Sequence, residues 1–418
     1  MITRTTIDQV YETARVEEVI GDFVVLKKSG SNFKGLSPFS QERTPSFMVS
    51  PVKQIWKDFS SGKGGNVVAF LMEHEQFTYP EAIRFLANKY NIEIEETEQS
   101  HQEKEKANAR ESLYLVNQFA QESFTQDLWE FPEGKAIGLS YFRERGFTDE
   151  IIRLFGLGYA AQQRDRFYKK VTKAGYAENY TLETGLIIKN ERGAVDRFRG
   201  RVIFPIRSMA GRVQGFGGRI LSATLKTAKY INSPESEVYH KSKVLYGMFE
   251  AKKAIAKEDI CYLVEGYTDV IQMFQLGIEN IVSSSGTALT PEQIRLVRRL
   301  TPNIVVLFDG DSAGLRATIR GIDLILEQGM NVRVCSFPEG EDPDSFAKSH
   351  TKEEIIKYLK ESAKDFIQFK TDLLLQESGN DPVKKANTVR DIVKSISKIP
   401  DAIQQEIYLK QCASSMEV

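Results

Sequence analysis

The stretch from residue 259 to residue 346 decides the fold, and it reads DICYLVEGYTDVIQMFQLGIENIVSSSGTALTPEQIRLVRRLTPNIVVLFDGDSAGLRATIRGIDLILEQGMNVRVCSFPEGEDPDSF. Apolar runs rich in β-branched residues predict four buried strands, at 260–264, 280–283, 304–308 and 332–336. The segments between them have helical periodicity and cover 268–276, 291–300 and 313–328. Strands that alternate with helices predict an α/β fold, in which helices cover both faces of a parallel sheet.

Acidic side chains follow three of these strands. Glu265 comes just after the first strand, Asp309 and Asp311 follow the third, and Asp342 and Asp344 lie in the loop after the fourth. Because the carboxyl ends of parallel strands meet at one edge of a sheet, we expect the five acids to converge. Such acids repel one another unless a cation lies among them, and Mg²⁺ accepts carboxylates while keeping positions for water and phosphate. The alternative is a set of solvated acidic loops on an ordinary α/β domain.

Two motifs in this stretch, VEGYTDVI and LFDGDSAG, resemble the TOPRIM fold shared by DnaG-type primases, topoisomerases and some nucleases. The later GEDPDSF and the sequence before residue 259 narrow the resemblance to bacterial DNA primase, over nearly the whole chain. The resemblance implies template-directed synthesis of RNA primers on single-stranded DNA from ribonucleoside triphosphates, with Mg²⁺ or Mn²⁺ as cofactor. A bound metal would lower the pKa of the primer 3′-hydroxyl and neutralise charge on the triphosphate.

Within that mechanism we assign roles to the acids. Asp309 and Asp311 are expected to be the first metal ligands, and Asp342 and Asp344 to join them or to support them. Glu265 is expected either to bind metal or to act on the proton of the attacking hydroxyl, and the sequence does not choose between these roles.

Residues 1–98 resemble the zinc-ribbon domain that begins bacterial primases, through FKGLSPF, ERTPSF and GGNVVAFLM. Family members place three cysteines and one histidine at the positions of Ser37, Ser40, Asp58 and Ser61. Serine hydroxyls are poor zinc ligands and one aspartate cannot hold the ion alone, so we expect no zinc here. The predicted elements are a helix at about 6–20, a hairpin of 46–49 with 54–59, and helices at about 66–74 and 79–90.

Apolar packing is expected to replace the metal in this domain. The side chains assigned to that packing are Phe33, Phe39, Phe47, Ile55, Trp56 and Phe59. In the family this domain contacts template DNA, and its cations could still do so here. For each cation taken alone, a solvated charged surface is an equally good interpretation. The cations concerned are Lys34, Arg43, Lys53, Lys57 and Lys63.

A basic stretch becomes visible when charge is counted by segment. The 418 residues carry a formal net charge of −1, but from Arg192 to Lys243 there are 11 Lys or Arg against 3 Asp or Glu, interleaved with glycines and aromatics. Cations follow phosphates and aromatic faces stack on bases, so the pattern favours single-stranded nucleic acid. The alternative is a basic set of strands whose aromatics are core. The residues that match basic-motif positions of the primase family, and that we expect to hold template or nucleotide, are Arg199, Arg201, Lys229, Tyr230, Asn232 and Lys241.

The expected domain organisation follows from these motifs. It comprises a zinc-ribbon-like domain at 1–98, a linker or solvated helix at 99–112, the first part of an RNA polymerase core at 113–258, a TOPRIM subdomain at 259–346 and a helical end at 347–418. Family members usually continue into a separate helicase-binding domain. We find no counterpart to that domain in the sequence, and therefore expect that the chain is a fragment or that this part lies elsewhere.

Other classes of protein fit the sequence less well. A TOPRIM nuclease or topoisomerase would use the same acids for strand cleavage, but a topoisomerase also needs a tyrosine nucleophile in a dedicated domain, and we find none. A non-catalytic binding protein would keep the basic stretch and lose the acids. The three cysteines, Cys261, Cys335 and Cys412, form no disulfide framework, and no run approaches membrane-spanning length. We therefore expect a cytoplasmic protein that works at replication forks.

Overall fold

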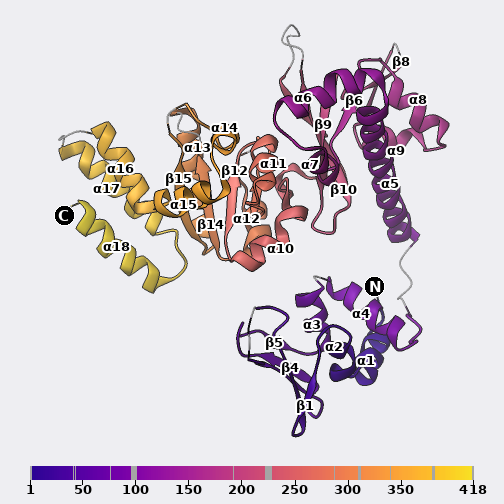
Figure 1. Ribbon diagram of the computed structural model, residues 1–418, viewed down its shortest axis with the longest axis vertical. Helices are drawn as coiled ribbons and strands as arrows, with labels where there is room; N and C mark the ends of the chain where they lie inside the picture. Colours follow the sequence, from indigo (N-terminus) through magenta and orange to yellow (C-terminus); the bar gives the residue numbers. More distant parts are fainter. Residues whose placement is uncertain are drawn as a thin grey trace. The chain divides into compact units, whose positions relative to one another are not determined.

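The computed structural model describes residues 2–416 apart from 41, 43, 76, 96–100, 192, 222–227, 287, 309–311, 339 and 379–381, and it does not describe the side chains of 101–107, 312–318, 373–378, 382, 384 and 385. The chain divides into two compact units, Met1–Ala107 and Asn108–Val418 (Figure 1). The finer domain boundaries given above stay a prediction.

The N-terminal unit is built on a five-stranded antiparallel sheet whose strands lie in sequence order. These are β1 (Lys27–Ser29), β2 (Asn32–Gly35), β3 (Phe47–Ser50), β4 (Ile55–Asp58) and β5 (Gly64–Gly65). Helices α1 (Arg4–Thr13), α2 (Val16–Gly21), α3 (Val67–His74) and α4 (Tyr79–Lys89) accompany it. The predicted hairpin is therefore confirmed, with Phe47 opposite Asp58, and so are the two later helices.

The single helix expected at about 6–20 is wrong, because the chain breaks between α1 and α2. Ala14 is extended, with ψ of 130°. The amides that the break frees find partners elsewhere in the unit: Arg15 N donates to the Tyr90 hydroxyl at 3.1 Å and Val16 N to Gln54 Oε1 at 3.0 Å. These tertiary hydrogen bonds compensate for the lost helical turn.

An aromatic cluster fills the core of this unit. The rings of Phe47 and Trp56 stack with centroids 5.5 Å apart, and Phe70 meets Trp56 edge-on at 5.7 Å. Phe33 and Phe39 are partly buried against the same core, as expected.

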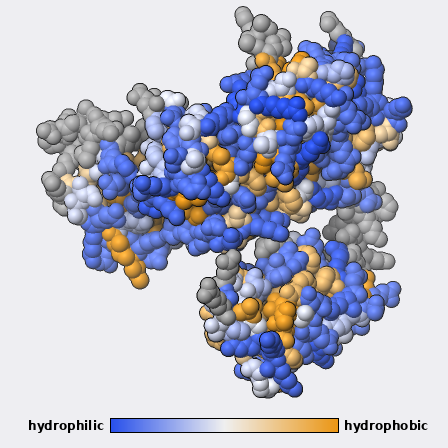
Figure 2. Space-filling model, viewed as in Figure 1, coloured by the Kyte–Doolittle hydropathy of each residue, from blue (hydrophilic) through white to orange (hydrophobic). Residues whose placement is uncertain are grey.

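Two residues assigned to that core are exposed instead, so the expectation is wrong for them. Ile55 is 42% exposed and Phe59 is 69% exposed. Side chains alternate between the faces of β4, so Trp56 and Asp58 point inward while Ile55 and Lys57 point outward, and Phe59 follows the end of the strand. Apolar side chains gather on the visible face of this unit (Figure 2).

The second unit begins with helices around a four-stranded antiparallel sheet of order β11-β10-β9-β6. Its strands are β6 (Gly158–Ala160), β9 (Arg201–Arg207), β10 (Val213–Ile220) and β11 (Tyr230–Asn232), and β7 (Ile187–Asn190) pairs separately with β8 (Gly193–Asp196). The helical segments are α5 (His101–Glu130), η1 (Gly134–Leu139), α6 (Ser140–Glu144), α7 (Asp149–Leu154), α8 (Arg166–Lys173), α9 (Glu178–Glu183) and η2 (Lys241–Lys243). From His101 onward, the segment interpreted as a linker or a solvated helix is helical.

The next sheet has the predicted parallel order. Strands β12 (Cys261–Val264), β13 (Ile281–Ser283), β14 (Asn303–Phe308) and β15 (Asn331–Ser336) pair in parallel in the order β13-β12-β14-β15. The short edge strand β16 (Lys364–Asp365), which the sequence analysis missed, is antiparallel to β15. The helices of this region are α10 (Met248–Glu258), α11 (Tyr267–Gln275), α12 (Pro291–Arg298), α13 (Ser312–Glu327), α14 (Pro343–Ser349) and α15 (Lys352–Ser362).

Alternating residues of β14 show that helices cover both faces of this sheet. Val305 packs in one core with Val270 of α11 and residues of α14 and α15. Ile304 packs in a second core with Ile294 of α12 and residues of α10 and α13. Both faces are thus buried, which confirms the predicted α/β fold.

The C-terminal region is helical, as its periodicity predicts, in α16 (Phe366–Ser378), α17 (Pro382–Ile396) and α18 (Ala402–Met416). The buried Lys370 ties α16 to the sheet region through an ion pair of 3.0 Å with Asp323 of α13. The three cysteines are free and buried. Among the described residues, no helix combines the length and the apolar character needed to cross a membrane.

Candidate active site

Glu265 lies at the carboxyl edge of the parallel sheet, directly after β12, with its side chain exposed. Its carbonyl oxygen accepts hydrogen bonds from the Ser283 hydroxyl at 2.6 Å and from the Gly286 amide at 3.2 Å. The Ser283 hydroxyl also accepts from the Ser285 amide at 2.8 Å. These bonds hold the turn after β13 against the backbone of Glu265.

Asp309 and Asp311 lie outside the described residues, so their assignment as metal ligands stays a prediction. Phe308, the last residue of β14, is buried and brings the chain to the same edge of the sheet as Val264 of β12. The described part of the chain contains no group of three or more His, Cys, Asp or Glu side chains placed to hold a metal ion.

Asp342 occupies the N-cap of α14. Its Oδ1 accepts from the Ser345 amide at 2.7 Å, while its own amide donates to Ser345 Oγ at 2.9 Å. A carboxylate at a helix N-terminus satisfies free amides and stabilises the helix, and this contact holds the side chain in place.

Asp344 is 7% exposed, and its two carboxylate oxygens differ. Oδ2 accepts from Arg145 Nη1 at 2.7 Å and from Lys348 Nζ at 2.8 Å, whereas Oδ1 is buried without a hydrogen-bond partner among the described residues. A hard cation such as Mg²⁺ binds carboxylate oxygens of this kind. Oδ1 of Asp344 therefore offers one carboxylate ligand, and the described residues around it do not complete a metal site.

A series of contacts between arginines and aromatic rings links Asp344 to Tyr230. The guanidinium carbon of Arg145 lies 5.5 Å from the centroid of the Tyr141 ring, and that of Arg219 lies 5.3 Å from the centroids of both Tyr141 and Tyr230. Arg219 Nη1 also donates to the Tyr230 hydroxyl at 2.8 Å. Burial raises the pKa of Tyr141 to about 12, so its hydroxyl is neutral.

Arg145, Arg219 and Tyr141 are not among the site residues expected from the sequence. Arg219 stands in the glycine-rich basic pattern GFGGRIL, which is the signal that could have identified it. Arg145 contacts Asp344, which lies 199 positions later in the sequence, and no local sequence pattern predicts such a contact.

A second contact joins the basic residues to the acidic edge. The Tyr267 hydroxyl donates to Asn232 Oδ1 at 2.7 Å, which connects β11 to the first residue of α11. Gly217 makes room for this contact, because a Cβ at that position would lie 2.5 Å from Cζ of Tyr267. Since α11 starts two residues after Glu265, β11 is held beside the acidic edge.

The other predicted nucleic-acid residues differ in exposure. Arg201 is buried and donates to the carbonyl oxygens of Gly218 at 3.3 Å, Lys229 at 3.2 Å and Ala228 at 3.1 Å, and burial lowers its pKa. Arg199 and Lys229 are exposed. Lys241 begins η2, where its amide donates to Glu235 Oε1 at 2.9 Å.

In the N-terminal unit, the four positions of the zinc-ligand pattern share one hydrogen-bond network. The hydroxyls of Ser37 and Ser61 both donate to Asp58 Oδ2, the former at 2.8 Å. Ser40 Oγ lies 2.6 Å from Ser60 Oγ, which donates to Asp58 Oδ1 at 2.9 Å. We call this set the Asp58 network. Arg43, one of the cations considered for DNA contact, lies outside the described residues.

Asp58 is fully buried. Burial alone raises the pKa of its carboxyl, but hydrogen bonds from Ser61, Ser37 and Ser60 outweigh that effect and bring the pKa below its ordinary value. The carboxylate is therefore charged at neutral pH and acts as the common acceptor of the surrounding serines.

Comparisons with known families assign most of the chain. Residues 124–252 match the family described as DNA primase catalytic core, N-terminal domain. The other matches are CHC2 zinc finger at 2–102, Toprim-like at 262–347 and DnaB-helicase binding domain of primase at 367–418. A DNA primase of Clostridium acetobutylicum is 37% identical over 415 residues, which cover 98% of this chain and 67% of that protein. This chain belongs to the bacterial DnaG-type DNA primases.

Further relatives and solved primases agree. A DNA primase of Halalkalibacterium halodurans is 37% identical over 425 aligned positions, covering 100% of this primase and 69% of that protein. The crystal structure of the zinc-binding and RNA polymerase domains of the Aquifex aeolicus primase has a TM-score of 0.66 and 32% identity, and covers 99% of this primase and 97% of that chain. A DnaG primase catalytic domain bound to single-stranded DNA has a TM-score of 0.68 and 30% identity, over 75% of this primase and 98% of that chain.

The function expected from the sequence is thereby confirmed: the protein is a DNA primase, a nucleotidyltransferase that synthesises RNA primers. The strand-cleaving alternative is not favoured. The Toprim-like match implies binding of a divalent metal.

One expectation is wrong. No counterpart to a helicase-binding domain is expected from the sequence, yet residues 367–418 match the helicase-binding family. These residues include nearly all of α16 and the whole of α17 and α18. Amphipathic periodicity reveals the helices, but it does not distinguish the end of a polymerase core from a short docking domain.

Proposed function

We propose that primer synthesis in this protein takes place between the acidic edge of the parallel sheet and strand β11. The contact between Tyr267 and Asn232 carries this proposal, because it fixes the basic strand next to Glu265. A divalent cation supplies charge neutralisation on the triphosphate and activation of the primer 3′-hydroxyl when bound. Asp309 and Asp311 are its proposed principal ligands, and the Oδ1 atom of Asp344 is a further candidate.

The remaining residues have proposed supporting roles. Arg145 and Lys348 hold Asp344 in a fixed orientation, and Asp342 fixes the start of the same helix. Glu265 either binds the cation or accepts the proton of the attacking hydroxyl. The test of this arrangement is incorporation of ribonucleotides on a single-stranded template by the Asp309→Ala and Asp311→Ala variants.

We further propose that single-stranded DNA and nucleotide phosphates bind along the cations of this region, chiefly the exposed Arg199 and Lys229 and the half-buried Lys241. One related primase catalytic domain has been solved bound to single-stranded DNA, and the same class of ligand suits a cationic surface with aromatic rings. Arg201 has its guanidinium directed at backbone carbonyls, so we propose that it positions Lys229.

Replacing Lys229 with alanine is expected to weaken binding of single-stranded DNA and to reduce the slope of log affinity against log salt by about 0.7, since one phosphate contact is lost. The measurement is fluorescence anisotropy with an oligodeoxythymidine across a salt series. Lys173→Ala, at an exposed position of α8 outside the basic stretch from Arg192 to Lys243, is the matched control and is expected to leave the slope unchanged. An unchanged slope in the Lys229 variant would show that this lysine is only solvated.

We propose that the N-terminal unit folds without zinc, although it matches a zinc-finger family. The Asp58 network supports this proposal, because it already satisfies the polar atoms at the four ligand positions. Elemental analysis of the purified protein is expected to find far less than one zinc per chain, and the melting curve to be the same with and without a strong chelator. Stoichiometric zinc, or a melting temperature that falls on chelation, would contradict the proposal.

We propose that the C-terminal helices bind the replicative helicase, through an apolar surface on α18. Ile403 is 73% exposed and Ile407, one turn later, is 58% exposed. Ile403→Asp with Ile407→Asp is expected to weaken helicase binding at least about tenfold, as expected for loss of buried interface anchors, and to leave primer synthesis without helicase unchanged. The control pair, Ser414→Asp with Ser415→Asp, lies on the same helix at exposed positions and should bind normally. Equal binding by both pairs would exclude this surface.

We also propose that the protein works in the cytoplasm, at replication forks.

A further inference from the structure

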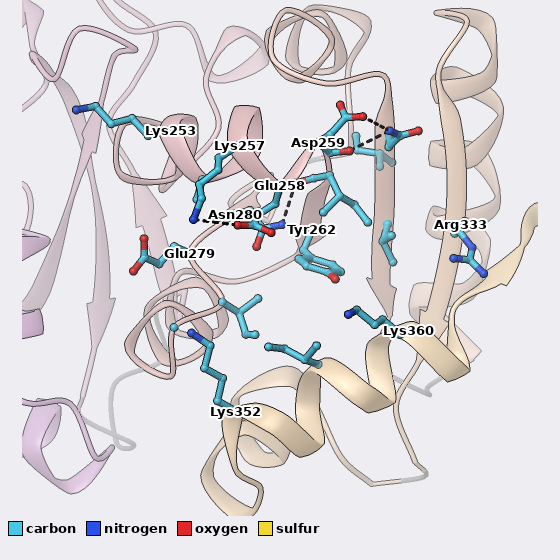
Figure 3. A pocket seen from close by; sticks show the side chains of 18 of the residues that line it. Lys253, Lys257, Glu258, Asp259, Tyr262, Glu279, Asn280, Arg333, Lys352 and Lys360 are labelled. Carbon is cyan, nitrogen blue, oxygen red and sulfur yellow. Dashed lines mark hydrogen bonds and ion pairs between the residues drawn. The ribbon is translucent and has the colours of Figure 1, made fainter. Parts of the chain in front are cut away.

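A cavity of about 910 Å³ opens at the amino edge of the parallel sheet, the edge opposite Glu265 (Figure 3). The first residues of β12, β14 and β15 line one side of it, and α15 lines the other through Lys352, Ile356 and Lys360. The end of α10 and the turn before β13 complete the wall. At a rise of about 3.3 Å per residue, strands of this length separate the cavity from the acidic edge by roughly 13–20 Å.

The wall of this cavity carries an excess of positive charge. Lys253, Arg333, Lys352 and Lys360 line it, and none of them forms an ion pair with a carboxylate in the part of the chain that the structure describes.

Three acids also line the cavity, namely Glu258, Asp259 and Glu279, and Glu258 lies 3.5 Å from the nearby Lys257. When Lys257 is counted, the lining has five cations against these three acids, so positive charge remains in excess. Cations held around a concave wall raise the local potential and favour an anion.

An aromatic ring and aliphatic side chains form the apolar part of the wall. Tyr262 of β12 is partly buried, and its ring points into the space between the sheet and α15, as does the side chain of Lys360 (Figure 3). Val305 and Ile356 are the neighbouring apolar residues of the wall. A planar ligand group would therefore meet an aromatic face close to the cations.

We propose that this cavity binds a nucleoside polyphosphate, with its base against Tyr262 and its phosphates among Lys352, Lys360 and Arg333. The volume lies within the range of about 300–1,000 Å³ that is usual for small-molecule sites. The cations come from three separate elements and surround one space, which suits a compact ligand better than a continuous strand of nucleic acid. Its position on the far edge of the sheet separates this ligand from the nucleotide that is polymerised.

The test measures equilibrium binding of ATP, inorganic tripolyphosphate and an oligodeoxythymidine to the full chain. EDTA is present throughout, to suppress metal-dependent nucleotide binding at the acidic edge. Lys352→Ala with Lys360→Ala is expected to lower the affinity for ATP and for tripolyphosphate at least about tenfold, since charge-assisted contacts are lost. Lys357→Ala, at an exposed position of the same helix outside the cavity wall, is the control and should change neither affinity by more than about twofold.

Two variants of Tyr262 test the nucleoside part of the proposal. Tyr262→Leu is expected to weaken ATP binding and to leave tripolyphosphate binding unchanged, whereas Tyr262→Phe keeps the ring and should retain both. Thermal melting identifies a variant whose fold is damaged, and Tyr262→Phe then provides the comparison.

Absence of ATP binding by the unaltered protein, or equal losses in the Lys357 control, would overturn the proposal. A loss confined to the oligonucleotide would show a nucleic-acid surface instead, and equal ATP and tripolyphosphate responses to Tyr262→Leu would exclude the nucleoside.

Discussion

Primer synthesis is expected to fall by on the order of a hundredfold or more when Asp309 or Asp311 is replaced by alanine, because each change removes a negative charge from a site that must hold a divalent cation. The fold is expected to survive, since both positions follow the end of β14 rather than lying within its buried run. The measurement is incorporation of ribonucleotides on a single-stranded template with Mg²⁺, together with thermal unfolding of each variant.

The matched control for this experiment is Glu361→Ala. Glu361 is an exposed acid near the end of α15 and does not line the cavity at the amino edge of the sheet. Its removal changes the net charge equally but is expected to leave synthesis within about twofold of normal. Near-normal synthesis by the Asp309 or Asp311 variant would refute the assignment of that residue.

Replacing Asp58 with alanine is expected to destabilise the N-terminal unit by about 1–3 kcal/mol. The change removes the buried carboxylate that is the common acceptor of the Asp58 network and leaves the hydroxyls of Ser37 and Ser61 without it. Fluorescence of Trp56 reports unfolding of this unit, provided that Trp129, the other tryptophan of the chain, is first changed to phenylalanine.

Asp22→Ala is the control for the same measurement. Asp22 pairs with Lys89 on the surface of the same unit, and exposed ion pairs contribute at most about 1 kcal/mol. If the two variants unfold alike, the Asp58 network does not stabilise the unit.

The lowered pKa of the Asp58 carboxyl predicts how the free energy of unfolding of the N-terminal unit depends on pH. Its pKa in the folded protein lies below the ordinary value of about 3.9. The contribution of this group is therefore complete above that ordinary value, and it is lost as the pH falls through the lower folded-state pKa. The Asp58→Ala variant should lack this part of the acid dependence, which urea titrations at several pH values can measure.

Local sequence patterns were sufficient to predict the parallel sheet, but not the contacts that complete the site. β-Branched runs identified β12, β13, β14 and β15, because strands buried on both faces must be apolar throughout. The two-residue strand β16 is too short to produce such a pattern. The pairing of Arg145 with Asp344 depends on how distant segments pack, so periodicity carries no information about it.

The same limit explains the errors in the N-terminal unit. The break between α1 and α2 is stabilised by Tyr90 and Gln54, which are distant in sequence. Phe59 was assigned to the core because of its hydrophobicity, whereas the position before it in the chain, Asp58, is the one that points inward.

The Asp58 network has a consequence for the chemistry of oxidative stress. Zinc ribbons that use thiolates are open to peroxides and electrophiles, because oxidation of a cysteine ligand releases the ion. No cysteine occurs in residues 1–98, and the three in the rest of the chain are buried. Hydroxyl and carboxylate groups do not react with mild oxidants, so an oxidant that would disable a thiolate-bound ribbon has no target in the Asp58 network.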